Sequence, residues 1–517
     1  MTMHEERDVV IVGGGPAGLA AAHRLAAAGL RVTVLDEQPE LGGQYFRRPA
    51  PEVARVWGEH RPEGRRLVEA VRAAGVECRT GHLVWGVDDD GRTLLVSDPA
   101  EHPVRLRGRY VIVATGAYER PFPFPGWQLP GVTTPGFAQH LAAADHTPIG
   151  ERVLLAGSGP FLLPVACSLL ALGVRVAGIA EAGHPYRPGL RALGAVRHPA
   201  RLRELAGYAA RLARARVPLW QDTVVVRADG GERVTSVTLA ATAAPTRAVR
   251  TVAVDALCVG YGFRPQSDLA RMLGCAVRTD PATGDATPVL TASGRSTRDD
   301  VYVIGEAAGI GGAPIAAARG LAAALDILAR EGHDVPAAEL RGPARAGRRL
   351  ERFKKLTDAL YPAPAELARL LPATLPDAAT LCRCEAVTAG EVRRVARTTA
   401  GDVNATKAWT RAGMGPCQGR ECGFAVSAVA RTSPDVFPSR LPVRPVPVTT
   451  LLEMARTEAA RTEVSPTEAT TRAGAARPEA ARPEPARPEP ARPEAARPEA
   501  ARPEPARPEP AGEGEAA

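Results

Sequence analysis

Long hydrophobic runs are absent from this sequence of 517 residues. No apolar stretch approaches the roughly 20 residues that a membrane-spanning helix needs, so we expect no transmembrane segment. The first residues also lack the apolar core of a secretory signal, because a strand predicted at 9–12 follows a short charged stretch and runs directly into Gly13. We therefore expect the protein to be made and kept in the cytoplasm.

Cysteine and histidine are too scattered for most thiol and hydrolytic chemistry. Four of the eight cysteines stand alone, with no CxxC or CxxxxC pair among them: Cys78, Cys167, Cys258 and Cys275. A dithiol–disulfide reductase needs such a pair, so that class is excluded. The ten histidines are equally scattered, and no Ser/His/Asp or Cys/His constellation is visible. The sequence therefore leaves the catalytic residues unknown.

The charge pattern argues against a nucleic-acid partner. The formal net charge is +8 and aromatic residues make up 4% of the chain. The arginines are spread along the sequence, without the dense Lys/Arg blocks or interleaved aromatics of nucleic-acid-binding proteins. We predict no nucleic-acid binding, and an acidic protein partner fits the positive excess better.

The strongest positive signal is a glycine-rich turn near the start of the chain. The strand at 9–12 leads into this turn and an alanine-rich helix to about residue 28, and a second strand at 31–35 ends at two acids. In this arrangement the first glycine makes a tight turn, the second lets the backbone approach a pyrophosphate, and the third lets helix and strand pack closely. A carboxylate after the second strand accepts hydrogen bonds from ribose hydroxyls, and here Asp36 holds that place with Glu37 as the fallback. The predicted dinucleotide-binding residues are Gly13, Gly15, Pro16, Ala17, Gly18, Asp36 and Glu37.

Three further segments, each at or near the end of a predicted strand, favour FAD as the dinucleotide. They are the loop with Gly43 and Gln44, the turn Thr115-Gly116, and the turn Gly305-Glu306 before a second glycine-rich helix start. Taken together, these segments resemble the two-dinucleotide-binding-domain flavoproteins. The resemblance implies that Glu306 takes the place of an acidic residue, usually Asp, that closes over the ribityl chain.

A second, weaker dinucleotide pattern lies in the middle of the chain. A predicted strand at 152–155 is followed by Gly157-Ser158-Gly159, and a strand at 174–180 precedes Glu181. Leu162 stands where the third glycine of the first copy stands, which alters the packing of helix on strand. NAD(P) binding and a retained but empty fold both stay open at this unit.

The other four cysteines form two close pairs near the C-terminal third. Cys382 and Cys384 make a CxC pair, and Cys417 and Cys422 make a CxxxxC pair. Four thiolates hold a [2Fe-2S] cluster or a zinc ion. Structural zinc sites usually use CxxC loops, so the spacing favours the cluster, with zinc and a metal-free core as the alternatives.

The sequence around these cysteines resembles a known family. The pattern CRCE followed by TRAGMGPCQGREC looks like the bacterioferritin-associated-ferredoxin-like [2Fe-2S] domain. The combination of this domain with the preceding flavoprotein fold is similar to opine oxidase A subunits, the B subunit of hydrogen cyanide synthase, dye-linked proline dehydrogenase subunits and sarcosine oxidase alpha subunits. The resemblance implies a hetero-oligomer in which a separate FAD subunit of the glycine-oxidase type oxidises the C–N bond, with a small third subunit left open.

We predict an α/β two-dinucleotide-binding-domain flavoprotein with an inserted NAD-like domain, a small α-helical [2Fe-2S] domain and a disordered tail. The unit Arg-Pro-Glu recurs seven times between Arg477 and Arg507, and proline at that density blocks a continuous helix. The expected divisions are 1–120 and 266–335 for the FAD-binding domain, 121–265 for the second dinucleotide domain, 336–376 for a helical linker, 377–435 for the [2Fe-2S] domain, 436–455 for a segment packed on the body, and 456–517 for the tail.

Two functions fit these features. The first is an FAD- and [2Fe-2S]-containing electron-transfer subunit of an amine or amino-acid dehydrogenase or oxidase, acting on an opine, proline, glycine or sarcosine-like substrate. The alternative is a self-sufficient NAD(P)H-dependent reductase that feeds its own cluster. The incomplete second glycine pattern counts against the alternative.

Overall fold

The computed structural model describes residues 5–57, 61–88, 90–185, 198–362, 365–367, 370, 374–430 and 441–464. Residues 1–459 form one compact unit and residues 460–517 a second. The Arg-Pro-Glu repeats and the predicted junction at 435–436 lie outside the described residues. None of the described helices is long and apolar enough to cross a membrane.

A seven-stranded sheet carries the first glycine turn. Its parallel strands are β1 (Glu5–Val12), β2 (Val32–Asp36), β3 (Glu77–Thr80), β6 (Pro103–Val113) and β19 (Val301–Val303), and β4 (Leu83–Val87) and β5 (Thr93–Ser97) extend it in the antiparallel sense. The order β3-β2-β1-β6-β5-β4, with β19 also paired to β6, places β1 in the middle. The carboxyl ends of β1, β2, β6 and β19 therefore meet at one edge, where ligands of such sheets bind.

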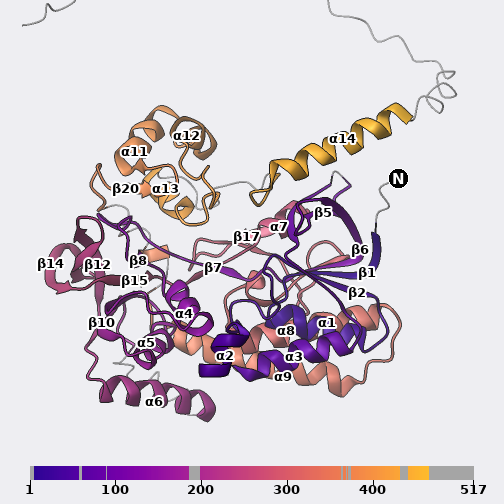
Figure 1. Ribbon diagram of the computed structural model, residues 1–517, viewed down its shortest axis with the longest axis horizontal. Helices are drawn as coiled ribbons and strands as arrows, with labels where there is room; N and C mark the ends of the chain where they lie inside the picture. Colours follow the sequence, from indigo (N-terminus) through magenta and orange to yellow (C-terminus); the bar gives the residue numbers. More distant parts are fainter. Residues whose placement is uncertain are drawn as a thin grey trace, which may run out of the picture. The chain divides into compact units, whose positions relative to one another are not determined.

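Helices α1 (Pro16–Ala26) and α8 (Ala313–Arg330) lie side by side against this sheet (Figure 1). Their approach depends on glycine, because a Cβ added at Gly320 would stand 2.1 Å from the carbonyl oxygen of Ala17. Three more helices belong to this part of the chain: α2 (Pro51–Trp57), α3 (Pro62–Ala73) and α9 (Ala337–Asp358). The 3-10 helix η2 (Gly305–Ala308) follows β19.

A second sheet is inserted between two short strands that connect it to the first. These connecting strands, β7 (Ala117–Glu119) and β16 (Phe263–Pro265), pair in the antiparallel sense. The inserted parallel sheet has the order β11-β10-β9-β15-β8. It consists of β8 (Val132–Thr133), β9 (Arg152–Gly157), β10 (Arg175–Glu181), β11 (Leu219–Trp220) and β15 (Ala256–Gly260). The inserted NAD-like domain of the predicted fold is confirmed.

Other elements complete this middle region. Helices α4 (Pro135–Ala144), α5 (Leu162–Ala171) and α6 (Pro199–Arg214) accompany the inserted sheet, together with an antiparallel meander of β12 (Thr223–Gly230), β13 (Val234–Ala241) and β14 (Ala244–Ala253). After the insertion come α7 (Asp268–Met272) and the pair β17 (Val277–Thr279) and β18 (Ala286–Pro288).

The four clustered cysteines lie in a small, mostly helical domain. It contains β20 (Thr380–Cys382), β21 (Val387–Thr388), α11 (Ala389–Thr398), α12 (Val403–Thr410) and α13 (Gly423–Ala430). A capping box starts α11, because the Thr388 side chain accepts from the Glu391 N–H and the Glu391 carboxylate accepts from the Thr388 N–H. Leu381, Val392 and Val426 are buried in a separate apolar core of this domain.

Helix α14 (Val448–Val464) continues past residue 456, where the sequence predicts the start of a disordered tail. The prediction is wrong for 456–464, because this stretch has no proline and consists largely of good helix formers such as Ala, Arg and Glu. The first turns of the helix are anchored by the buried Thr450, whose hydroxyl lies 3.0 Å from that of Ser97.

Candidate cofactor sites

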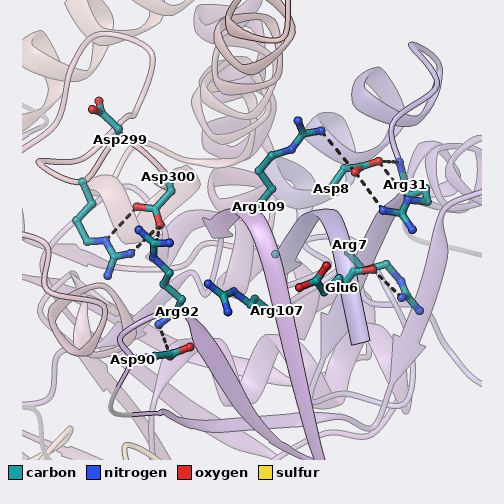
Figure 2. A pocket seen from close by; sticks show the side chains of 12 residues that line it. Glu6, Arg7, Asp8, Arg31, Asp90, Arg92, Arg107, Arg109, Asp299 and Asp300 are labelled. Atoms are coloured by element: carbon teal, nitrogen blue, oxygen red, sulfur yellow. Dashed lines mark hydrogen bonds and ion pairs between the residues drawn. The ribbon is translucent and has the colours of Figure 1, made fainter. Parts of the chain in front are cut away.

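A hollow of about 860 Å³ lies away from the glycine turn (Figure 2). Charged side chains near the amino end of β1 and in the middle of β6 line it. These side chains largely pair with one another: Asp8 accepts from Arg31 and Arg109, and Asp300 binds Arg298. A hollow whose charges are mutually paired offers few groups to a ligand, whereas ligands of such sheets bind at the carboxyl ends of the strands.

The glycine turn after β1 has the geometry that the sequence predicts. Gly13 has a φ of +110°, and a Cβ there would lie 2.3 Å from the carbonyl oxygen of Ala114, the residue after β6. A Cβ at Gly18 would lie 2.0 Å from the carbonyl oxygen of Gly13. Any side chain at either position would push the turn off the sheet, so these two glycines fix the path of the backbone.

Gly15 is different, because it faces open space. A Cβ added at Gly15 would meet nothing nearer than the Cα of Gly43, at 4.0 Å. Gly15 is the N-cap of α1 and Pro16 follows at the first helical position, so backbone N–H groups and the positive end of the helix dipole lie beside this space. The loop with Gly43 also lies against this turn, because a Cβ at Gly43 would stand 2.9 Å from the Cα of Gly15. The features that a pyrophosphate site needs, a glycine without a close neighbour on its Cβ side and a helix N-terminus, are thus present at Gly15.

The two acids after β2 have different surroundings. Asp36 is buried, and its carboxylate accepts from the N–H groups of Gly14 at 2.7 Å and Gln38 at 2.8 Å. Burial raises the pKa of Asp36, and these hydrogen bonds oppose that effect. The side chain of Glu37 is 40% exposed and lies beside Arg444. Asp36 therefore holds the glycine turn with one hydrogen bond on each oxygen, and Glu37 is the more exposed of the two acids.

The turn after β19 is held by contacts with α1 and by hydrogen bonds among residues near the start of α8. A Cβ at Gly305, which has a φ of +64°, would lie 2.9 Å from the Cβ of Ala17 on α1. The Glu306 carboxylate accepts from the N–H of Gly312 at 3.0 Å, and burial raises its pKa. Arg319 donates to the carbonyl oxygens of Gly305 and Gly309. Glu306 thus stabilises the start of α8, a role that the sequence pattern did not indicate.

The remaining predicted residues lie at the junction of the two sheets. Thr115 donates its hydroxyl to the carbonyl oxygen of Gln266 at 2.9 Å, and Gly116, with a φ of +79°, accepts from the Gln266 N–H at 3.0 Å. Gln44 is exposed next to Gly43. The structure therefore brings the predicted glycines, Ala17, Thr115 and Asp36 together around the carboxyl ends of β1, β2, β6 and β19.

The second glycine turn resembles the first in its backbone but not in its packing. Gly157 and Gly159 have φ values of +143° and +121°, and Glu181 accepts from the N–H groups of Gly159 and Gly183, both at 3.1 Å. Glu181 is 1% exposed, and burial raises its pKa to about 7. Leu162, in place of the third glycine, is buried in the core. Both oxygens of the candidate ribose-binding acid are therefore already engaged.

The four clustered cysteines contact one another. A hydrogen bond with the Cys422 thiol lowers the pKa of Cys382 to about 6 and that of Cys417 to about 5. The same bonds raise the pKa of Cys422, whereas burial raises that of Cys384. These contacts bring the thiols of the CxC pair and of the CxxxxC pair together in one small domain. Four adjoining thiols can hold a [2Fe-2S] cluster.

Glycines and one ion pair shape the loops that carry these cysteines. A Cβ at Gly415 would lie 2.3 Å from the Cβ of Cys384, so the Cys417 loop can approach Cys384 only with glycine there. Arg411 ends α12 in the left-handed conformation and donates to Glu385 at 2.8 Å. The close approach at Gly415 and the ion pair of Arg411 with Glu385 thus hold the two cysteine-bearing loops beside each other.

The cluster domain is attached to the inserted domain by side chains that the sequence reasoning missed. Trp127 is fully buried and donates its indole N–H to the carbonyl oxygen of Thr380 at 2.7 Å, and the guanidinium of Arg383 lies 3.9 Å above its ring. Phe424 of α13 packs on Phe122 at 6.0 Å, with Arg120 4.8 Å from the Phe424 ring. Nothing local in the sequence marks Trp127 as an interface residue, because its partners lie more than 200 residues away.

The open space at Gly15 gives a direct test of the first site. Substitution Gly15→Val should abolish retention of FAD, because the branched side chain fills the space that a pyrophosphate needs. The measurement is flavin absorbance per chain after gel filtration. Gly207→Val is the matched control, because a Cβ at Gly207 on α6 also meets no atom within 4 Å. Full flavin occupancy in the Gly15 variant would show that this loop is assigned wrongly.

The four thiols give a second prediction. Protein purified without oxygen should hold about two irons and two acid-labile sulfides per chain. Cys417→Ser should remove or destabilise the cluster and leave FAD bound, since the two sites are built from different domains. Cys78→Ser, outside the cluster domain, is the control that keeps both. Stoichiometric zinc without sulfide would contradict the assignment.

Glu181 predicts a pH dependence of stability. Its pKa is raised in the folded protein, so its ionisation favours the unfolded state, and stability is lost as pH rises from about 4.5 through about 7. The Glu181→Gln variant should not lose stability in this way. Its free energy of unfolding, measured with urea, should therefore rise relative to that of the wild type by about 3 kcal/mol between these two pH values. Glu77→Gln is the control: the pKa of Glu77 is lowered to about 2, and its removal should not change the slope between pH 5 and 8. Parallel pH profiles for Glu181→Gln and wild type would refute the buried acid.

Comparison with known protein families agrees with this arrangement. The family model "Pyridine nucleotide-disulphide oxidoreductase" matches residues 7–320, and the model "BFD-like [2Fe-2S] binding domain" matches residues 380–431. The first match spans both sheets and the second spans all four clustered cysteines. The chain is thus an FAD-dependent oxidoreductase with a [2Fe-2S] cluster, and NAD(P) stays open.

Individual relatives cover nearly the same length. The A subunit of opine oxidase from Rhizobium meliloti is 34% identical over 85% of this chain and 97% of its own length, and hydrogen cyanide synthase subunit HcnB of Pseudomonas aeruginosa is 33% identical over 85% and 97%. The crystal structure of L-proline dehydrogenase from P. horikoshii shares the fold, with a TM-score of 0.62, 22% identity, and coverage of 87% of this chain and 81% of that one. The chain therefore belongs to the pyridine nucleotide-disulphide oxidoreductase family, among the members that carry a BFD-like [2Fe-2S] domain and include HcnB and the A subunit of opine oxidase.

Proposed function

We propose that this chain is the electron-transferring subunit of a heteromeric amine or amino-acid dehydrogenase or oxidase. The observation that carries the proposal is the attachment of a four-thiol domain to a flavoprotein fold within one compact unit. When bound, FAD exchanges two electrons with an organic compound, and a [2Fe-2S] cluster passes them on one at a time. The residues of the chain bind the two groups and keep them in one body.

The cysteines outside the cluster domain support the proposal that electrons leave the flavin through the cluster and not through a pair of thiols. All eight cysteines lie in the described part of the chain and none forms a disulfide. Cys167, Cys258 and Cys275 are buried, and burial raises the pKa of each thiol. A buried thiol with a raised pKa is a poor nucleophile, so thiol–disulfide exchange beside the flavin is not supported. Free thiols also fit a reducing compartment such as the cytoplasm.

The partner in this proposal is a glycine-oxidase-like FAD subunit that oxidises the C–N bond of an opine, proline, glycine or sarcosine-like substrate. Two relatives of nearly equal length are named as subunits, of opine oxidase and of hydrogen cyanide synthase. The described residues around the glycine turn are mainly glycines and acids already engaged by backbone N–H groups. They offer no evident base for an amine substrate, which favours a second subunit for that step.

A self-sufficient NAD(P)H-dependent reductase is the second candidate. It is favoured by the intact backbone of the second turn, where a Cβ at Gly159 would meet no atom within 4 Å. The burial of Glu181, which is 1% exposed, and the buried Leu162 count against it, because a nicotinamide dinucleotide needs an accessible ribose-binding acid and close helix–strand packing.

Anaerobic stopped-flow absorbance separates the two candidates. Mixed with candidate amines, the lone chain should show flavin bleaching slower than about 0.1 s⁻¹, roughly 100-fold below a typical turnover rate. Photoreduction of the same sample is the control that its flavin can be reduced. Addition of a glycine-oxidase-like subunit should confer substrate-dependent reduction of a dye. Rapid bleaching of the lone chain by an amine would contradict the division of labour, and rapid bleaching by NADH would favour the second candidate.

A further inference from the structure

Arg444 connects a distant segment of the chain to the first dinucleotide site. It lies between the cluster domain and α14, and its guanidinium donates to both carboxylate oxygens of Glu37, with 2.6 Å to Oε1. A second nitrogen of Arg444 donates to the hydroxyl of Tyr118 on β7. The Arg444 side chain is 19% exposed, so it is held in place rather than free in solvent.

Glu37 is the more accessible acid at this site. Asp36 is 8% exposed, whereas the side chain of Glu37 is 40% exposed. An ionised carboxylate has about four lone-pair positions. Glu37 can therefore accept from Arg444 and from ribose hydroxyls together, and the contact with Arg444 fixes the direction in which its carboxylate points.

Two acids lie next to each other at this site. Burial raises the pKa of Asp36, the adjacent charge of Glu37 adds to that rise, and the charge of Arg47 opposes it. A pyrophosphate beside α1 adds more negative charge to the same region. Arg444 offsets part of this charge, as arginine does wherever planar recognition of oxyanions is needed.

The backbone around Arg444 is fastened on both sides. Val443 donates its N–H to the carbonyl oxygen of Trp85 at 2.8 Å in the first sheet. From the Cys417–Cys422 loop, Gln418 donates to the carbonyl oxygen of Pro442 at 3.2 Å, and Arg420 donates to that of Val443. The position of Arg444 thus depends on both the flavoprotein fold and the loop that carries two of the cluster cysteines.

We propose that Arg444 is a positioning residue for FAD, which holds Glu37 toward the ribose of the adenosine half and ties retention of the cofactor to the cluster loop. This inference rests on the assignment of FAD to the first glycine turn. It adds a residue that no dinucleotide pattern contains, because Arg444 follows Glu37 by 407 residues.

The test is the affinity of the full chain for FAD, measured by quenching of flavin fluorescence. Arg444→Ala should raise the Kd for FAD about tenfold or more, as expected when one charged hydrogen-bonding partner is lost. Arg444→Lys should recover part of the affinity, since it keeps the charge but not the planar fork. Arg31→Ala is the matched control: it loses the same charge just before β2, at the opposite end from Asp36, where Arg31 pairs with Asp8.

A double-mutant cycle separates positioning from loss of structure. Glu37→Gln should weaken FAD binding, and Arg444→Ala combined with Glu37→Gln should weaken it little more than either change alone. Wild-type affinity in Arg444→Ala, effects that multiply in the double variant, or an equal loss in Arg31→Ala would each overturn the inference. A wrong assignment of FAD to the first glycine turn would give different results. Either the wild-type protein would bind no FAD, or the Gly15→Val variant would still bind it.

Discussion

The contact between Trp127 and β20 is the interaction on which the rest of the structure depends. It joins the inserted domain to the strand that ends in Cys382, through one hydrogen bond to Thr380 and the stacked guanidinium of Arg383. Together with the packing of Phe424 on Phe122, it keeps the cysteine domain from being a separate module on a linker. With it, the cluster loops lie against the same body that carries the glycine turn.

Arginines reinforce this attachment where the domains meet. Arg420, inside the Cys417–Cys422 loop, binds Asp268 of α7 at 3.2 Å, and its carbonyl oxygen accepts from Arg264 at 3.4 Å. Arg120 is buried with Asp285 at 2.5 Å, and burial lowers its pKa to about 10. A buried pair of this kind is weak evidence for stability but a strong constraint on geometry, because breaking it leaves an uncompensated charge. The contacts set by Trp127 are thereby held in one arrangement.

Local features were predictable from the sequence, and long-range ones were not. Gly13, Gly15 and Gly18 follow from the strand–turn–helix pattern: Gly13 and Gly18 are required by close backbone neighbours, and Gly15 by the cofactor that the pattern implies. The four cysteines follow from their spacing. The engagement of Glu306 by Gly312, the contact of Arg444 with Glu37 and the partners of Trp127 depend on packing between distant segments. Helix α14 continues to Val464, beyond the predicted start of the tail at residue 456, because residues 456–464 are largely good helix formers.

The flavin site and the cluster site belong to one chain. The most direct test of this arrangement is to reduce the bound flavin with light in anaerobic protein and to follow the visible absorbance of the [2Fe-2S] cluster at several protein concentrations. The account predicts that the cluster bleaches at a rate independent of protein concentration, because the two sites belong to one body. A rate proportional to concentration, or a cluster that stays oxidised while the flavin is reduced, would contradict it.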